Sequence, residues 1–78
     1  MIVIAESKIK LSDAKAVEEF VSAASKCDFD IDIFYNRMII DAKSILGILS
    51  MDLTKTLTVQ CYGENQEFNR TLQKFAIA

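Results

Sequence analysis

Residues 29–40 carry the pattern of a β-hairpin, and this pattern restricts the fold more than any other part of the chain. Apolar side chains at every second position from 29 to 35 alternate with aspartates and Phe34, which is the period of a strand with one buried face. Asn36 and Arg37 separate this strand from an apolar run over 38–40, and Asn in so short a connection favours a hairpin turn. The commonest such turn needs positive φ at both central residues, so either Arg37 is mildly strained or the turn is of another type.

The remaining periodicities predict three helices and two further strands. A strand rich in Ile and Val is expected over residues 1–9, and an alternating strand over 57–62. Apolar steps of three and four residues predict a first helix over 12–25 and a last helix near the C-terminus, and a short helix starts at Ser44. The apolar stripes comprise Ala14, Val17, Phe20, Val21 and Ala24 in the first helix and Phe68, Leu72 and Phe75 in the last.

The resulting order, βαββαβα, describes a single domain over residues 1–78. Strands in hairpin and split-βαβ arrangement, with helices along one face, form a two-layer α+β sandwich. Phe34 and Tyr62 then point to the sheet face that no helix covers. Two scattered aromatic side chains on such a face are usually without function, and a contact patch is the alternative.

Composition narrows the classes of partner. The net charge is −2, and no apolar run approaches the ~20 residues of a membrane span, so we expect neither nucleic acid nor a membrane as partner. The N-terminus lacks the basic region and the long apolar core of a signal peptide, which favours a cytoplasmic protein. Cys27 and Cys61 are far apart in the sequence, and we expect both to be reduced core residues.

The chain contains no histidine. This absence removes the commonest general base, the commonest zinc ligand and any phosphohistidine chemistry. The cysteines lack metal-ligand spacing, and Gly47 and Gly63 alone cannot build a glycine-rich phosphate loop. We therefore expect no enzymatic activity, no metal and no cofactor.

Residues 43–51, Lys-Ser-Ile-Leu-Gly-Ile-Leu-Ser-Met, form the most informative motif. Ser44 stands where a helix N-cap belongs, and its hydroxyl can also take a phosphate, which carries about −1.5 to −2 charges at neutral pH. Lys43 lies beside it in the sequence and can partly neutralise that charge. Gly47 weakens the short helix by about 1 kcal/mol relative to alanine. So short a helix cannot bury all of its apolar side chains.

Together these features resemble HPr, the phosphocarrier family of the bacterial sugar phosphotransferase system. The resemblance spans nearly the whole chain and implies an HPr-like open-faced β-sandwich, with a four-stranded antiparallel sheet and three helices on one face. Its regulatory serine motif is nearly intact over 43–51. The other matching pieces are Phe20–Lys26 at the end of the first helix, Tyr35-Asn36 with its spacing to Ser44, and Gly63-Glu64-Asn65 at the start of the last helix.

The family's phosphate-carrying histidine is missing. It lies in a Gly-Leu/Ile-His-Ala-Arg-Pro-Ala stretch, and the corresponding residues 11–17 read Leu-Ser-Asp-Ala-Lys-Ala-Val. A gapless alignment places Asp13 at the histidine position, whereas pairing Leu11 with the apolar residue before the histidine places Ser12 there. Lys15 takes the position of the arginine. Asp13 is either a helix N-cap or a fixed negative charge that mimics the phosphorylated state.

The resemblance therefore implies a regulatory binding module, similar to the catabolite-repression homologues of HPr, which also lack the histidine. Ser44 is the expected phosphosite. The implied partners are an HPr kinase/phosphorylase, a LacI-type transcription regulator or a metabolic enzyme, which contact a face comprising Lys15, Lys43, Ile45, Leu46 and Leu49.

Two alternatives remain open at this point. The first is a phosphocarrier that uses Asp13 or Ser12 in place of histidine, since an aspartyl phosphate is labile enough for transfer. The second is a degenerate paralogue with a structural role, including a weak homodimer through the open sheet face instead of a monomer.

Overall fold

A computed structural model describes residues 2–77 of this chain, and its elements follow the predicted order. The strands are β1 (Ala5–Ile9), β2 (Ile31–Tyr35), β3 (Met38–Asp41) and β4 (Leu57–Cys61). The helices are α1 (Ala14–Ser25), α2 (Ile45–Leu49) and α3 (Gln66–Phe75). Within residues 2–77, no helix has the length and apolar character needed to cross a bilayer.

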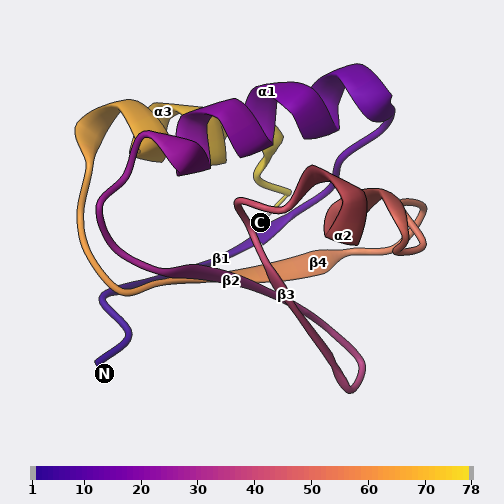
Figure 1. Cartoon of the computed structure of the whole chain (residues 1–78), viewed down its shortest axis with the longest axis horizontal. Coiled ribbons are helices and arrows are strands. Elements are labelled where there is room, and N and C mark those ends of the chain that lie inside the picture. Colours follow the sequence, from indigo (N-terminus) through magenta and orange to yellow (C-terminus); the bar gives the residue numbers. More distant parts are fainter. Residues whose placement is uncertain (1, 78) are drawn as a thin grey trace.

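The strands form one antiparallel sheet in the order β1-β4-β2-β3, and all three helices lie on the same face of it (Figure 1). This architecture confirms the predicted open-faced sandwich. Ile33 and Val59 are opposite each other in the sheet and fully buried on the helical side. Because side chains alternate along a strand, Phe34 lies on the open face, and so does Tyr62, whose hydroxyl donates to the Gln60 side chain at 3.4 Å.

β1 is shorter than the predicted strand over residues 1–9. Pairing with β4 starts at Ala5, which lies opposite Cys61, the last residue of β4. Residues 2–4 lie beyond this point, and the Ile4 N–H donates to the Cys61 carbonyl at 2.8 Å. Met1 is outside the described residues. The apolar composition of residues 2–4 therefore predicted a strand where β4 offers no residues for continued pairing.

The buried stripe of α1 differs slightly from the predicted one. Ala16, Val17, Phe20 and Ala24 are buried, whereas Ala14 is exposed and Val21 only partly buried. Successive helical residues are rotated by about 100°, and the buried face is centred on Phe20 and Ala24, so Ala14 and Val21 fall at its margins. Including Ala14 in the stripe was wrong. The Phe20 ring packs edge-on against Phe68 of α3, with 5.6 Å between the ring centroids.

The hairpin turn is not the commonest two-residue type, in which both central residues have positive φ. Tyr35 pairs with Met38, so Asn36 and Arg37 alone connect β2 to β3. Asn36 has φ of 52°, and it is the only residue other than glycine with positive φ among residues 2–77. A turn with positive φ at both central residues is thus excluded, and Arg37 carries no such strain.

Both cysteines are free and buried, as the sequence predicted. Burial raises the pKa of the Cys61 thiol to about 11 and also raises the pKa of Cys27, against the opposing effect of the Lys43 ammonium. Thiols held in the neutral form are poor nucleophiles. Within residues 2–77 no group of three or more His, Cys, Asp and Glu side chains is placed to hold a metal ion.

Gly63 is required for space at the end of β4. Its φ is not positive, but a Cβ at this position would overlap the ring of Phe29, a partly buried residue packed against the core. We expect Gly63→Ala to lower the free energy of unfolding by about 1–3 kcal/mol, because the ring must move out of a packed position. Urea denaturation measures this change.

Phe29→Ala supplies the control for that prediction. If the ring is the obstacle, Gly63→Ala should cost much less stability in the Phe29→Ala background. Equal costs in the two backgrounds would show that another feature of the turn requires glycine.

Candidate functional site

Ser44 is the N-cap of α2, as predicted. Its backbone is extended, with φ of −103° and ψ of 101°, and its Oγ accepts a hydrogen bond from the Gly47 N–H at 3.1 Å. The helix that follows has five residues, and Ser50 ends it by donating its hydroxyl to the Gly47 carbonyl at 2.6 Å. A serine hydroxyl therefore stands at the first turn of a short, tightly capped helix.

Gly47 allows α2 to sit close to β3 and to its own cap. A Cβ at this position would lie 2.8 Å from Cγ2 of Ile40 and 3.0 Å from Oγ of Ser44. The methyl of a β-branched residue has little freedom to move away. Alanine at position 47 would favour the helical backbone, but its methyl group would disturb the packing against Ile40 and Ser44.

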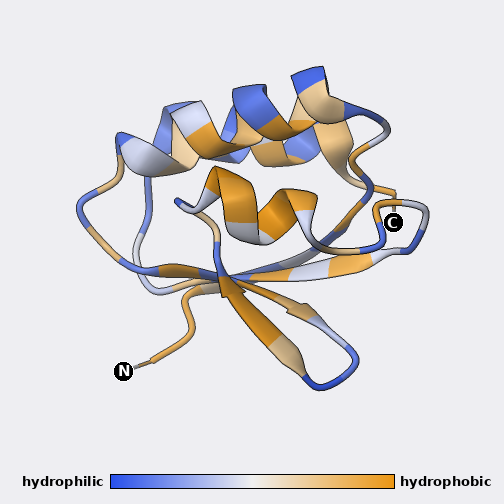
Figure 2. Ribbon diagram, turned by 45° about the vertical axis from the view of Figure 1, so that its right-hand side comes forward, coloured by the Kyte–Doolittle hydropathy of each residue, from blue (hydrophilic) through white to orange (hydrophobic). Residues whose placement is uncertain are grey.

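The outer side of α2 is apolar and exposed. Ile45, Leu46 and Leu49 have exposed fractions of 36%, 79% and 43%, and we call these three residues the α2 surface. Ile48 is fully buried and anchors the helix on the core. Figure 2 shows the hydrophobic colour of α2 on the outside of the molecule, where a surface helix normally carries polar residues. An exposed apolar cluster of this kind is typical of a protein-binding surface.

Lys43 makes hydrogen bonds through both its side chain and its backbone. Its ammonium group donates to the Cys27 carbonyl at 2.9 Å, and its backbone N–H donates to Asp41 Oδ1 at 2.9 Å. Cys27 lies just after α1, so this side chain ties the start of α2 to the end of α1. The predicted role of Lys43 in neutralising a phosphate on Ser44 stays a prediction.

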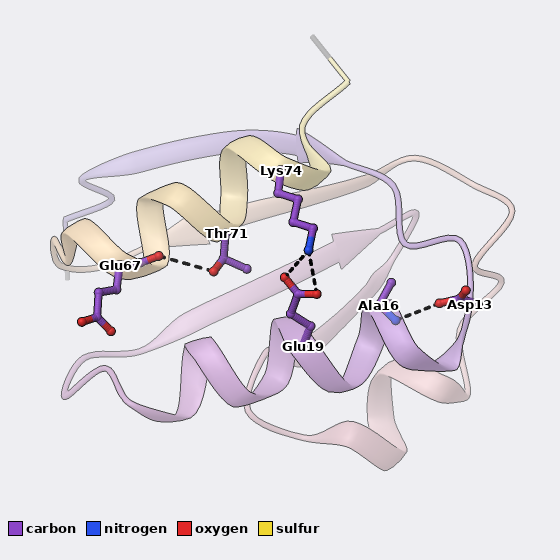
Figure 3. A network of polar contacts seen from close by, with 6 residues as sticks. All are labelled: Asp13, Ala16, Glu19, Glu67, Thr71 and Lys74. Atoms are coloured by element: carbon purple, nitrogen blue, oxygen red, sulfur yellow. Dashed lines mark hydrogen bonds and ion pairs between the residues drawn. The ribbon is translucent and has the colours of Figure 1, made fainter.

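At the start of α1, Asp13 occupies the N-cap position. Its Oδ1 accepts a hydrogen bond from the Ala16 N–H at 2.8 Å (Figure 3), and its backbone is extended, with φ of −158°. Ser12 precedes the cap, and both Ser12 and Lys15 are exposed. Of the two candidates for the histidine position, Asp13 is therefore the one that caps the helix.

The two predicted sites lie on neighbouring helices. α1 packs against both α2 and α3, and Figure 1 shows α2 beneath α1 on the helical side of the sheet. Asp13 and Lys15 begin α1, while Ser44 and the α2 surface belong to α2. The structure thus places the predicted residues on two adjoining helices.

A shallow polar groove between α1 and α3 was not predicted. Beside it, the Lys74 ammonium of α3 lies 2.8 Å from Glu19 Oε2 of α1 (Figure 3). Both side chains are about half exposed, so this ion pair adds little stability. The groove exists only because α1 and α3 pack side by side, so the sequence of either helix alone could not predict it. It is lined by Glu19, Ser22, Ala23, Lys26, Asn65, Glu67 and Thr71.

The capping role of Asp13 is testable with two substitutions. We expect Asp13→Ala to lower the free energy of unfolding by about 1 kcal/mol, since the Ala16 N–H loses its acceptor. Asp13→Asn removes the charge but keeps a capping oxygen, so its stability should stay close to that of the parent chain. Equal loss in both variants, measured by urea denaturation, would show that the charge matters more than the cap.

Comparisons with known proteins agree with this geometry. The family model described as the PTS HPr component phosphorylation site matches residues 7–76. The fold is similar to that of HPr-C-His from Thermoanaerobacter tengcongensis, with a TM-score of 0.74 and 24% identity over 91% of this chain and 89% of that one. The phosphocarrier protein HPr from Bacillus anthracis str. Ames has a TM-score of 0.70 and 24% identity, over 94% and 96% of the two chains.

A third similar structure is Crh, the catabolite repression protein of Bacillus subtilis. Its TM-score is 0.63 and its identity 19%, over 100% of this chain and 94% of that one. That crystal structure is described as a domain-swapped, intertwined dimer. At these identities the three structures establish the fold.

Proposed function

This chain belongs to the HPr family of the sugar phosphotransferase system, and from that premise we propose that it is a cytoplasmic regulatory module that binds proteins without carrying phosphate on histidine. The sequence has no histidine to carry it. The nearly intact serine motif over 43–51 supports a role that runs through Ser44. In this proposal the chain is bacterial, is not an enzyme and needs no cofactor.

The observation that carries the proposal is the combination of a capping serine with an exposed apolar helix. Ser44 heads α2, and the α2 surface follows it directly. A phosphate on Ser44 would add negative charge beside apolar side chains that a partner covers, and charge at an apolar interface changes which partners bind. Phosphorylation of Ser44 is thus proposed as the switch, and the α2 surface with Lys15 and Lys43 as the partner face.

The direct test is incubation with an HPr kinase/phosphorylase and ATP, followed by intact-mass and peptide mass spectrometry. We expect one phosphate, located on Ser44. An unmodified chain, alongside a positive control with a histidine-containing HPr, would count against the proposed switch. Modification of another serine in place of Ser44 would exclude Ser44 as the acceptor.

The partner face is testable at Leu46, the most exposed residue of the α2 surface. Leu46→Asn should weaken binding to the kinase or to a LacI-type regulator at least several-fold, while stability stays within about 0.5 kcal/mol, since the side chain is 79% exposed. Ile2→Asn is the matched control, because Ile2 is 80% exposed and lies outside α2. Calorimetric titration measures both variants, and equal affinities would exclude Leu46 from the interface.

The competing proposal is a carrier that uses Asp13 or Ser12. The position of Asp13 at the start of α1 favours it, because backbone N–H groups and the helix dipole stabilise added negative charge there. Against it, one carboxylate oxygen already accepts from Ala16. Incubation with the first enzyme of the phosphotransferase system and labelled phosphoenolpyruvate tests this carrier role. An acyl phosphate on Asp13 can hydrolyse when the sample is quenched, so the reaction should also be trapped with hydroxylamine. The absence of both label and trapped product would rule out the carrier role.

A further inference from the structure

β1 forms one edge of the sheet, and the C-terminal end of the chain covers only part of it. The Ile77 N–H donates to the Lys8 carbonyl at 3.1 Å, and the Lys10 N–H donates to the Phe75 carbonyl at 3.1 Å. Residues 75–77, which we call the strap, thus form a single isolated bridge to β1, between Ile9 and Ala76. Figure 1 shows the C-terminal end returning from α3 to β1.

The strap leaves the first half of β1 open. No strand lies beyond β1 in the sheet that the structure describes, and the bridge at Ile9 is the only pairing along its outer edge. The Glu6 side chain on this part of β1 is exposed, and the side chain of Ile4, just before β1, is 55% exposed. An exposed strand edge with apolar neighbours is a template for pairing with another strand.

The side chains of β1 are complementary to a second copy of the same strand. Antiparallel pairing about a two-fold axis at Ser7 places Glu6 opposite Lys8 of the other copy, and Lys8 opposite its Glu6. Both side chains are exposed and, because they are two residues apart, lie on the same sheet face. Opposite charges directly across antiparallel strands stabilise the pair. The same register needs the Lys8 carbonyl, which the strap now occupies.

We propose that the outer edge of β1 is a docking edge for β1 of a second copy, and that the strap competes with this copy for the edge. The dimer is isologous, since the same edge serves both chains. It joins two four-stranded sheets into one and leaves the α2 surface free. While the strap is paired, the chain is a monomer.

Ile77→Pro tests the competition. Proline removes the N–H that bonds to Lys8, and Ala76 already has φ of −65° and ψ of 140°, a backbone compatible with a following proline. Analytical ultracentrifugation of the Ile77→Pro chain should show an average mass that rises toward twice the monomer mass as the protein concentration increases. Ile77→Ala keeps the N–H and should match the parent chain. If Ile77→Pro stays monomeric at the highest soluble concentration while its circular dichroism shows a folded chain, the proposal is wrong.

The charge pair tests the register. In the Ile77→Pro background, Lys8→Glu places like charges opposite each other and should abolish the dimer. The further exchange Glu6→Lys restores the complementarity and should restore association. A dimer that persists with Lys8→Glu would overturn the proposed pairing in favour of another contact, such as an exchange of whole strands. If Ile77→Pro fails to fold, a chain that ends at Phe75 carries the same test.

Discussion

Ser44→Ala is expected to abolish phosphate incorporation by an HPr kinase/phosphorylase, and to lower the free energy of unfolding by about 1 kcal/mol. The first effect follows from the loss of the acceptor hydroxyl. The second follows because the Gly47 N–H loses the oxygen that caps α2 at 3.1 Å. Mass spectrometry measures the first effect and urea denaturation the second.

Two further variants separate these effects. Ser50→Ala removes the other serine hydroxyl of the motif, which donates to the Gly47 carbonyl at 2.6 Å, and should leave phosphorylation intact. Ser44→Asp keeps a capping oxygen and should preserve stability while losing the acceptor hydroxyl. Phosphate uptake by the Ser44→Ala chain would rule out Ser44 as the only acceptor and would weaken the proposed switch.

Phe20→Ala is expected to have the largest effect on stability, about 3–5 kcal/mol. Phe20 is fully buried, and its ring meets Phe68 at an interplanar angle of 62°, so its removal empties the contact between α1 and α3. A domain of this size buries only about 60% of its unfolded surface and has little stability in reserve. We therefore expect a largely unfolded chain at ambient temperature, measured by circular dichroism and urea denaturation.

Phe75→Ala serves as the comparison, because Phe75 is only partly buried at the edge of the core. Its cost should be clearly smaller, and the chain should remain folded. A cooperative, parent-like unfolding transition in Phe20→Ala would contradict the assignment of Phe20 to the centre of the core.

Local patterns allowed most of the fold to be predicted. The alternation before Asn36 and the helical stripe around Phe20 reflect the periods of strands and helices, which depend only on neighbouring residues. Ser44 was predicted as a cap because capping needs only the following turn, and the Gly47 N–H bond confirms it. The family resemblance rested on the same local motifs, and the family match over residues 7–76 confirms it.

Errors arose where a residue's environment is set by distant parts of the chain. Residues 2–4 looked like strand, but β4 ends at Cys61 and offers them no full partner. In the same way, nothing in the sequence indicates that the Lys43 ammonium reaches the Cys27 carbonyl. A flexible lysine can reach many acceptors, and only the packing of α1 against α2 selects one of them.

The sequence by itself determined the order of strands and helices, the cap at Ser44 and the lack of a histidine. These follow from hydrophobic period, capping preference and composition, which are properties of short segments. Tertiary structure alone decided that Lys43 binds Cys27, that the Phe29 ring requires Gly63, and that the strap covers half of β1. Each of these joins residues far apart in the chain, and such contacts exist only after the core has fixed where the segments lie.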